Sequence, residues 1–180
     1  MTVAAEQSNP ECEFLVQLLR RSQSTYLNAL ENVSPAQAAY KPGSERWSIA
    51  EVAEHVAATE QYMLKLIKNA SPSTEESDPR MDERIHRGGA DRTRTFTAPE
   101  GVRPRGRFRD LAEAAAYFSD ARRKTFEFVE QAQAGLRRLR VVHPVAGNID
   151  AYQNALIMAY HPERHAAQIA EIKAGAAYPK

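Results

Sequence analysis

The sequence has only one cysteine, Cys12, among its 180 residues, so no disulfide bond can form within the chain. A chain without disulfides suits a reducing compartment, and we expect this one to be cytoplasmic. Its first residues lack the basic and apolar segments of a secretory signal peptide. No stretch reaches the roughly 18 apolar residues that a membrane-spanning helix needs. We therefore expect no membrane partner.

An excess of charge of one sign is also missing. The chain has 24 Lys and Arg against 23 Asp and Glu, which gives a net charge of +1 at neutral pH, and it has no long run of basic residues. Composition therefore gives no reason to expect binding to nucleic acid. No Ser-His-Asp or Cys-His constellation stands out either, so the sequence does not point to nucleophilic catalysis by a side chain.

What the sequence does have is helical periodicity. Apolar residues recur at spacings of three and four along four long segments, which are 10–33, 48–70, 109–133 and 150–174. Such spacing is typical of amphipathic helices. Ser34, Ser48 and Asp150 each have a Gln or Glu three residues later, which is the pattern of a helix N-cap. We interpret residues 10–175 as one domain, an all-α four-helix bundle, preceded by a flexible tail at residues 1–9.

Residues 71–107 interrupt this pattern. They contain four prolines, four glycines and many charged residues, and no apolar periodicity survives there. A connection of this length is uncommon inside a compact domain. We predict that it crosses over along the bundle or that part of it is mobile, and the sequence leaves open whether it closes over a site as a lid. A helical turn fits only residues 82–86. We predict no pair of β-strands, although residues 136–142 could be extended.

Arg122 lies in the middle of the apolar stripe of the third long helix. An arginine on a core face is costly unless its charge is paired. It either forms a buried ion pair with a carboxylate, or reaches a functional cavity and clamps an anionic substrate or thiol, or extends to the surface. The sequence leaves these three alternatives open.

The candidate functional residues are histidines. His161 and His165 are four residues apart, so on a helix they share a face and could bind one divalent metal ion. The alternative is that each is an ordinary polar residue at the edge of the core. A metal site needs a third ligand, and His55 is the candidate, at the edge of the apolar stripe of the second long helix. The metalloprotease motif His-Glu-x-x-His is absent, since Pro162 stands where that motif has Glu.

Several short motifs, taken in order, resemble the DinB-like superfamily of damage-inducible four-helix bundles. They are Trp47-Ser48-Ile49 followed by Glu51 and His55, the turn from His143-Pro144 to Gly147, and His161-x-x-x-His165 followed by Gln168-Ile169. The segment Ala98-Pro99-Glu100 with Pro104, leading to Phe118-Ser119-Asp120-Ala121-Arg122, is also similar to one branch of the superfamily. The resemblance covers roughly residues 12–175.

The resemblance implies an up-up-down-down bundle with a long crossover connection. It also implies a divalent metal, nickel or zinc in relatives, held by His55, His161 and His165. Characterised members include thiol-dependent S-transferases and a mycothiol-dependent maleylpyruvate isomerase, and others are described as metal-dependent hydrolases. Homodimers are common among them. The resemblance therefore implies a small-molecule substrate and, for the transferase reaction, a low-molecular-weight thiol.

One residue departs from the pattern expected of such a helix. Pro162 lies between the two histidines, and a proline inside a helix removes a hydrogen bond and clashes with the preceding turn. If the helix kinks there, the two imidazoles do not converge. Alternatively, a kink or a π-bulge belongs to the site.

Three hypotheses follow. The first is a metal-dependent enzyme, a thiol S-transferase or a hydrolase, whose metal lowers the pKa of water or stabilises a thiolate. The second is a non-catalytic metal- or ligand-binding bundle, and the third is a bundle that has lost its metal. Tyr62 and Asn154 are candidates for groups behind the ligands or at the substrate, because each lies one or two turns from a proposed ligand. Their alternative role is that of ordinary residues at the edge of the core. Arg122 is the candidate clamp for an anion.

Overall fold

The structure, a computed structural model, describes residues 9–180. The predicted tail at residues 1–9 lies outside this part, except for Asn9, which caps the first helix. The elements are, in order, α1 Pro10–Leu30, α2 Pro35–Ala39, α3 Ile49–Lys68, β1 Ser71–Pro72, α4 Pro79–Gly88, η1 Glu100–Val102, α5 Leu111–Ala132, η2 Gln133–Arg138, β2 Leu139–His143, β3 Gly147–Asp150 and α6 Ala151–Lys173, where η marks a 3₁₀ helix. Among the described residues, no helix combines the length and the apolar character that a membrane span requires.

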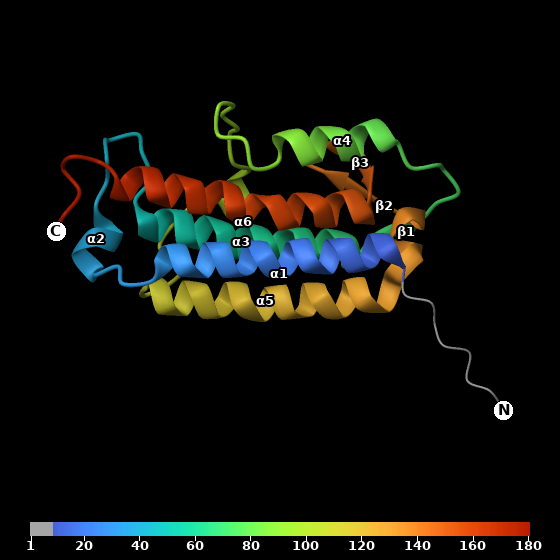
Figure 1. Cartoon of the computed structure of the whole chain (residues 1–180), viewed down its shortest axis with the longest axis horizontal. Coiled ribbons are helices and arrows are strands. Elements are labelled where there is room, and N and C mark those ends of the chain that lie inside the picture. Colours follow the sequence, from blue (N-terminus) through green and yellow to red (C-terminus); the bar gives the residue numbers. More distant parts are fainter. Residues whose placement is uncertain (1–8) are drawn as a thin grey trace.

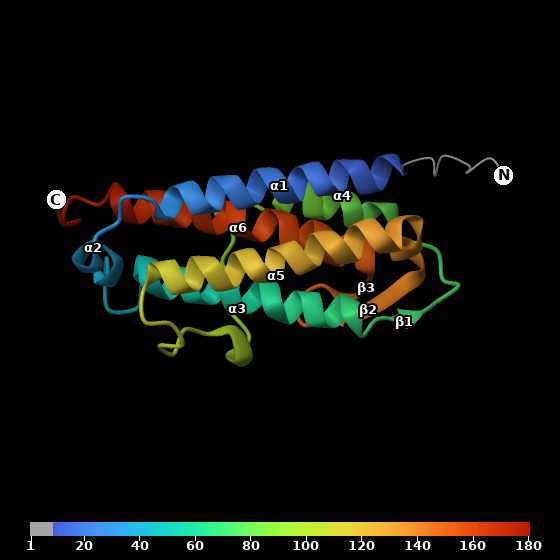
Figure 2. The same ribbon diagram turned by 90° about the horizontal axis from the view of Figure 1, so that it is seen from below.

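The four long helices α1, α3, α5 and α6 form the bundle (Figure 1). α1 and α6 run in one direction, and α3 and α5 run in the other. The largest contacts join α1 to α6 and α3 to α5, and Figure 2 shows these two pairs as the two halves of the bundle. In chain order, α1, α3, α5 and α6 run up, down, down and up. In their order around the bundle, α1, α6, α3 and α5 run up, up, down and down. The predicted four-helix bundle with a long crossover, here between the parallel helices α3 and α5, is confirmed.

Local sequence determines where these helices begin. The Ser48 hydroxyl accepts a hydrogen bond from the Glu51 amide, while the Glu51 carboxylate accepts one from the Ser48 amide. Ser34 and Asp150 begin α2 and α6 with the same reciprocal pair of hydrogen bonds. Each pair satisfies two backbone N–H groups that the start of a helix otherwise leaves without partners. The three predicted caps are confirmed.

The connection between α3 and α5 has more structure than the sequence predicted. α4 spans 10 residues instead of a single turn, and it packs against α6. β1 pairs antiparallel with β2, and β2 with β3, so a three-stranded sheet lies beside the bundle near the start of α6 (Figure 1). The prediction that no strands pair was therefore wrong. β1 has only 2 residues and β3 only 4, which is too short for an alternating pattern to be recognised.

A polar layer divides the core of the bundle. The side chain of Arg122 is completely buried there, and its Nε and Nη2 atoms lie 2.8 and 2.9 Å from the two carboxylate oxygens of Glu60. Its guanidinium group also lies 5.1 Å from the ring centroid of Phe118. Of the three alternatives for Arg122, the structure shows the buried ion pair. Its geometry is bidentate, which suits a guanidinium group and a carboxylate.

Candidate metal centre

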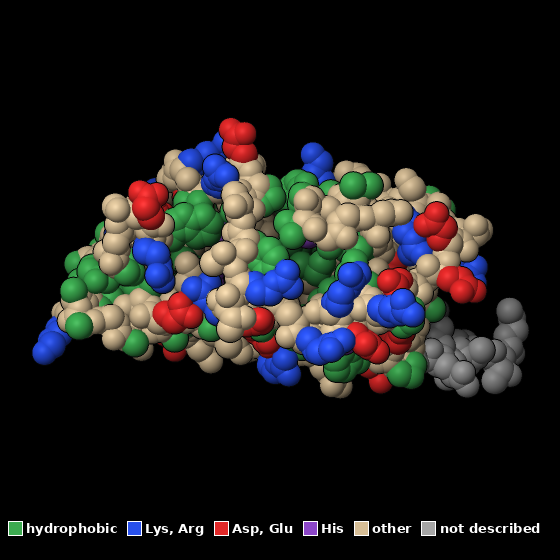
Figure 3. Space-filling view, turned by 90° about the horizontal axis from the view of Figure 1, so that it is seen from above, with side chains coloured by type: hydrophobic (Ala, Val, Ile, Leu, Met, Phe, Trp, Pro, Cys, Tyr) green, Lys and Arg blue, Asp and Glu red, His purple; other side chains and the backbone are tan. Residues whose placement is uncertain are grey.

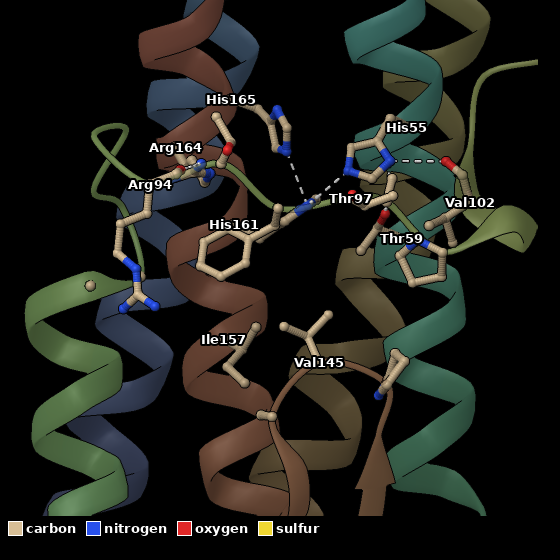
Figure 4. Close-up of a pocket in the computed structure, with 18 of the residues that line it drawn as sticks. His55, Thr59, Arg94, Thr97, Val102, Val145, Ile157, His161, Arg164 and His165 are labelled. Carbon is tan, nitrogen blue, oxygen red and sulfur yellow. Dashed lines mark hydrogen bonds between the residues drawn. The ribbon is translucent and has the colours of Figure 1, made fainter.

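Three histidine side chains meet between α3 and α6 (Figure 4). His55 projects from α3, and His161 and His165 project from successive turns of α6. Nε2 of His161 lies 3.1 Å from Nε2 of His55 and 3.1 Å from Nε2 of His165. The structure therefore brings together the three residues that the sequence and the resemblance put forward.

A backbone carbonyl orients the ring of His55. Nδ1 of His55 lies 2.9 Å from the carbonyl oxygen of Val102, at the end of η1. A carbonyl only accepts, so Nδ1 carries the proton and Nε2 keeps its lone pair. Glu54 holds the following loop, since its carboxylate accepts hydrogen bonds from the amides of Arg105 and Gly106 at 2.8 Å each. Burial alone would raise the pKa of Glu54, but these hydrogen bonds hold it below its ordinary value, so the group stays an anion.

Gln168 orients His165 in the same way. Its Oε1 atom lies 2.8 Å from Nδ1 of His165, one turn further along α6. Nη1 of Arg92 donates to the same oxygen at 3.4 Å, which supports its assignment as the carbonyl end of the amide. His165 therefore carries its proton on Nδ1 and presents the lone pair of Nε2 to the other two histidines.

These hydrogen bonds allow a test of whether the three residues suit a metal ion. Nε2 of both His55 and His165 points a lone pair at Nε2 of His161, which has at most one proton to donate. At least one of the two 3.1 Å contacts therefore has no proton between its nitrogens, and a cation bound by these nitrogens removes the resulting repulsion. Two nitrogens that bind one zinc ion at about 2.0–2.1 Å lie about 3.3 Å apart at a tetrahedral angle. The donor set fits a divalent metal.

Burial keeps the three imidazoles neutral. It lowers the pKa of His55, and the hydrogen bond to Val102 offsets this only in part. Burial, followed by the charges of the neighbouring histidines, also lowers the pKa of His161 and His165 well below the ordinary value. The neutral imidazole is the form that binds a metal. The site is therefore in its metal-binding state at neutral pH.

Pro162 lies inside α6, which continues past it from Ala151 to Lys173. Because proline has no N–H, the carbonyl of Met158, four residues earlier, loses its helical partner. Nη2 of Arg122 donates to that carbonyl at 2.9 Å. The backbone oxygen freed by the proline is thus satisfied from α5, and the two histidines on either side of Pro162 still converge.

The three histidines line a cavity of about 910 Å³. Its walls also include residues of α4, of the connection at 92–102 and of the turn at 143–146. Figure 3 shows this face of the molecule as hollowed, with hydrophobic side chains in the hollow and Lys and Arg side chains along its rim. The volume lies in the range of sites that hold small molecules.

The other three candidate residues lie in different places. Tyr62 lines the cavity and is 37% exposed. Asn154 is fully buried, with Nδ2 donating to the carbonyl of Met63 at 3.4 Å. Arg122 also lies outside the cavity lining. All five of its N–H groups are used in the core, on Glu60 twice and on Leu19, Ser22 and Met158. The structure therefore leaves Arg122 no donor with which to clamp a substrate.

Sequence reasoning missed two contributors to the site. Val102 acts through its backbone carbonyl, which no residue type signals, and it lies 47 residues from His55. Gln168 was noticed only as part of a motif, although its position three residues after His165 places it within reach on the same helix face. The three-residue spacing between His165 and Gln168 was therefore a sequence signal for this hydrogen bond.

Comparison with known proteins agrees with this geometry. A family model described as the DinB superfamily matches residues 18–169. Among solved structures, the chain is similar to YfiT from Bacillus subtilis, described as a probable metal-dependent hydrolase with an unusual four-helix bundle topology. The two share 14% sequence identity with a TM-score of 0.62, over 96% of this chain and 91% of that chain, which shows a common fold. No curated protein matches the sequence. Because the family model spans most of its length, the chain belongs to the DinB superfamily.

Proposed function

We propose that this protein is a metal-dependent enzyme that acts on a small molecule, with hydrolysis as the first candidate reaction. The observation that carries the proposal is the convergence of three neutral imidazoles on the wall of a cavity of about 910 Å³. A divalent ion such as zinc or nickel supplies a Lewis acid there, which lowers the pKa of water or of a thiol. The description of YfiT as a probable metal-dependent hydrolase supports the same reaction class.

The protein's own side chains hold and orient such an ion. Nε2 of His55, His161 and His165 would be the ligands. Val102 and Gln168 fix two of the three rings before any ion binds, because each accepts the Nδ1 proton of its histidine. A donor set oriented in advance loses little conformational freedom on binding, which favours a tight site.

The described lining of the cavity includes no cysteine, serine or lysine. Cys12 is buried elsewhere, and its thiol donates to the carbonyl of Val129 at 3.5 Å. Burial also raises the pKa of this thiol, so little of it is in the reactive thiolate form. The nucleophile in this proposal is therefore a water molecule or a small thiol that enters from solution.

Thiol S-transfer is the second candidate reaction. Because the lining offers no cysteine, this reaction needs a low-molecular-weight thiol as co-substrate, and the cavity has room for two small molecules. A non-catalytic metal-binding bundle is the alternative to both reactions. The homodimer, the cytoplasmic location and the absence of a nucleic-acid partner stay predictions.

Metal content is the first test. We expect untagged wild type and His86→Ala to carry near-stoichiometric metal after incubation with zinc or nickel, and His161→Ala to lose it. His86 is the matched control, because its Nδ1 pairs with the Tyr160 hydroxyl outside the three-histidine cluster. A wild type that stays empty would contradict the proposal.

Activity is the second test, made on protein loaded with zinc or nickel. Release of 4-nitrophenol from 4-nitrophenyl acetate reports hydrolysis. Conjugation of 1-chloro-2,4-dinitrobenzene with cysteine, glutathione or mycothiol reports S-transfer. We expect the loaded wild type to catalyse one of the two reactions faster than His161→Ala does. Loaded protein that is inactive in both would favour the non-catalytic bundle.

A further inference from the structure

One cation in the wall of the cavity forms no ion pair with a carboxylate of the described residues. Arg164 precedes the metal ligand His165 on α6, and its Nη2 donates to the backbone carbonyl of Arg94. Its Nη1 is buried and has no hydrogen-bond partner among the described residues. The Arg94 carbonyl thus fixes the position of the guanidinium group, while one of its nitrogens keeps its donors free.

The charged residues of the lining are mostly cationic. The lining residues include five arginines and two glutamates, with no lysine or aspartate. Arg92 is neutralised by Glu171, with 2.7 Å between Nη2 and Oε2. Arg94 and Arg164 have no carboxylate within ion-pair distance in residues 9–180. A cavity with an excess of cations in its lining attracts anions and raises their local concentration.

An exposed aromatic ring lies between these two cations. Phe96 is 53% exposed, although large apolar side chains are usually buried. The guanidinium carbon of Arg164 lies 5.3 Å from its ring centroid, and that of Arg94 lies 5.7 Å from it. These contacts hold both guanidinium groups at the cavity wall.

Another part of the lining is apolar. Val145, at the tip of the β2–β3 turn, and Ile157 on α6 both line the cavity. In Figure 4 these two side chains lie below His161, whereas Arg94 and Arg164 lie to its left and His55 lies to its right. His161 thus has a cationic part of the lining on one side and an apolar part below it.

We propose that this site takes a small organic acid, with its carboxylate bound by Arg164 and Arg94 and its apolar body against Val145 and Ile157. Guanidinium groups bind carboxylates with paired, charge-assisted hydrogen bonds. This inference rests on the proposed function, since it names the class of molecule that reaches the three histidines. The acid is either the substrate or the carboxylate-bearing thiol of an S-transfer reaction.

Calorimetry with matched probes tests the inference. On zinc-loaded protein we expect 4-phenylbutyrate to bind at least tenfold more tightly than 4-phenylbutan-1-ol, which differs only at the anionic end. N-acetylcysteine and its neutral amide form the corresponding thiol pair. A preference in the first pair assigns the carboxylate to the substrate, and a preference in the second pair alone assigns it to the thiol. No preference in either pair would overturn the proposal.

Substitutions locate the carboxylate. Arg164→Gln and Arg94→Gln should each reduce the preference for the acid at least fivefold, and Arg164→Lys should restore part of it. Arg94→Gln guards against misfolding, because the guanidinium group of Arg94 makes no hydrogen bond or ion pair among the described residues and lies 5.7 Å from the Phe96 ring centroid. Arg123→Gln is the control, since Arg123 pairs with Asp120 on the exposed surface of α5. A preference that survives both glutamine variants would contradict the inference.

Removal of the metal separates this inference from the proposed function. In protein stripped with a chelator, Arg164 remains in place, so the preference for 4-phenylbutyrate should persist. If it disappears with the metal and is unaffected by Arg164→Gln, the acid binds as a metal ligand and the arginine site is wrong. If the protein binds no metal but keeps the preference, the proposed enzyme fails while the acid site stands.

Discussion

Arg122 donates a hydrogen bond from Nη2 to the carbonyl oxygen of Met158 at 2.9 Å, and so replaces the partner that Pro162 removes. The same guanidinium group binds both carboxylate oxygens of Glu60. One side chain on α5 thereby joins α3, which carries His55, to α6, which carries His161 and His165. The buried ion pair and the three-histidine cluster are parts of one arrangement.

We predict that Arg122→Met destabilises the protein strongly. The substitution leaves the buried carboxylate of Glu60 without its cation, and breaking a buried pair in this way costs about 3–5 kcal/mol. Urea unfolding of the metal-free protein would measure this. Arg123→Met is the neighbouring control, because that side chain is 57% exposed and should cost within about 0.5 kcal/mol. Equal costs for the two variants would show that the buried pair does not stabilise the fold.

Arg122 and Pro162 should be energetically coupled. Pro162→Ala supplies an N–H for the Met158 carbonyl, so the bond from Arg122 to that oxygen becomes redundant. We expect Arg122→Met to cost about 1 kcal/mol less in the Pro162→Ala background than in wild type. A double-mutant cycle of unfolding free energies measures the difference. If the two costs simply add, Arg122 does not compensate for the proline.

Gln168 should tune the affinity for the metal without binding it. Gln168→Leu removes the acceptor for Nδ1 of His165, which then no longer has a fixed tautomer or ring orientation. We expect zinc affinity to fall about 10–100-fold, measured by competition with a chromophoric chelator. Gln168→Glu keeps an acceptor at the same place and should retain most of the affinity. Equal losses in both variants would contradict the orienting role.

His143 should make stability depend on pH. Its Nδ1 accepts hydrogen bonds from the amides of Val145 and Ala146 at 3.1 and 3.0 Å. Burial lowers the pKa of His143 from 6.5 to about 4. The unfolded chain therefore binds a proton more readily, so the stabilisation is complete above pH 6.5 and is lost as the pH falls towards 4, by at most about 3 kcal/mol.

The matched variant for this prediction is His143→Asn. The oxygen of Asn can accept the same two amide hydrogens in the turn but does not titrate in this range. Unfolding of metal-free wild type and variant, compared between pH 7 and pH 4, should show the smaller decrease in the variant. The other histidines are common to both proteins, so their contribution cancels. Parallel pH curves would argue against His143 as the source.

The sequence alone was sufficient for features that depend on neighbours along the chain. The caps at Ser48 and Asp150 join residues three positions apart, and the helices follow from apolar spacing. His161 and His165 lie on the same helix face because they are one turn apart on a single helix. The proline between them does not change this, because its missing hydrogen bond is compensated elsewhere.

Features that join distant segments were decided only by the tertiary structure. His55 lies 106 residues from His161, and packing of α3 against α6 brings their Nε2 atoms to 3.1 Å. The sequence left three roles open for Arg122, and only the packing of α5 on α3 selected the buried ion pair with Glu60. The Val102 carbonyl reaches His55 because Glu54 ties down the loop that follows. Helix caps and periodicity are local, whereas a metal centre depends on how the helices pack, which no short stretch of sequence encodes.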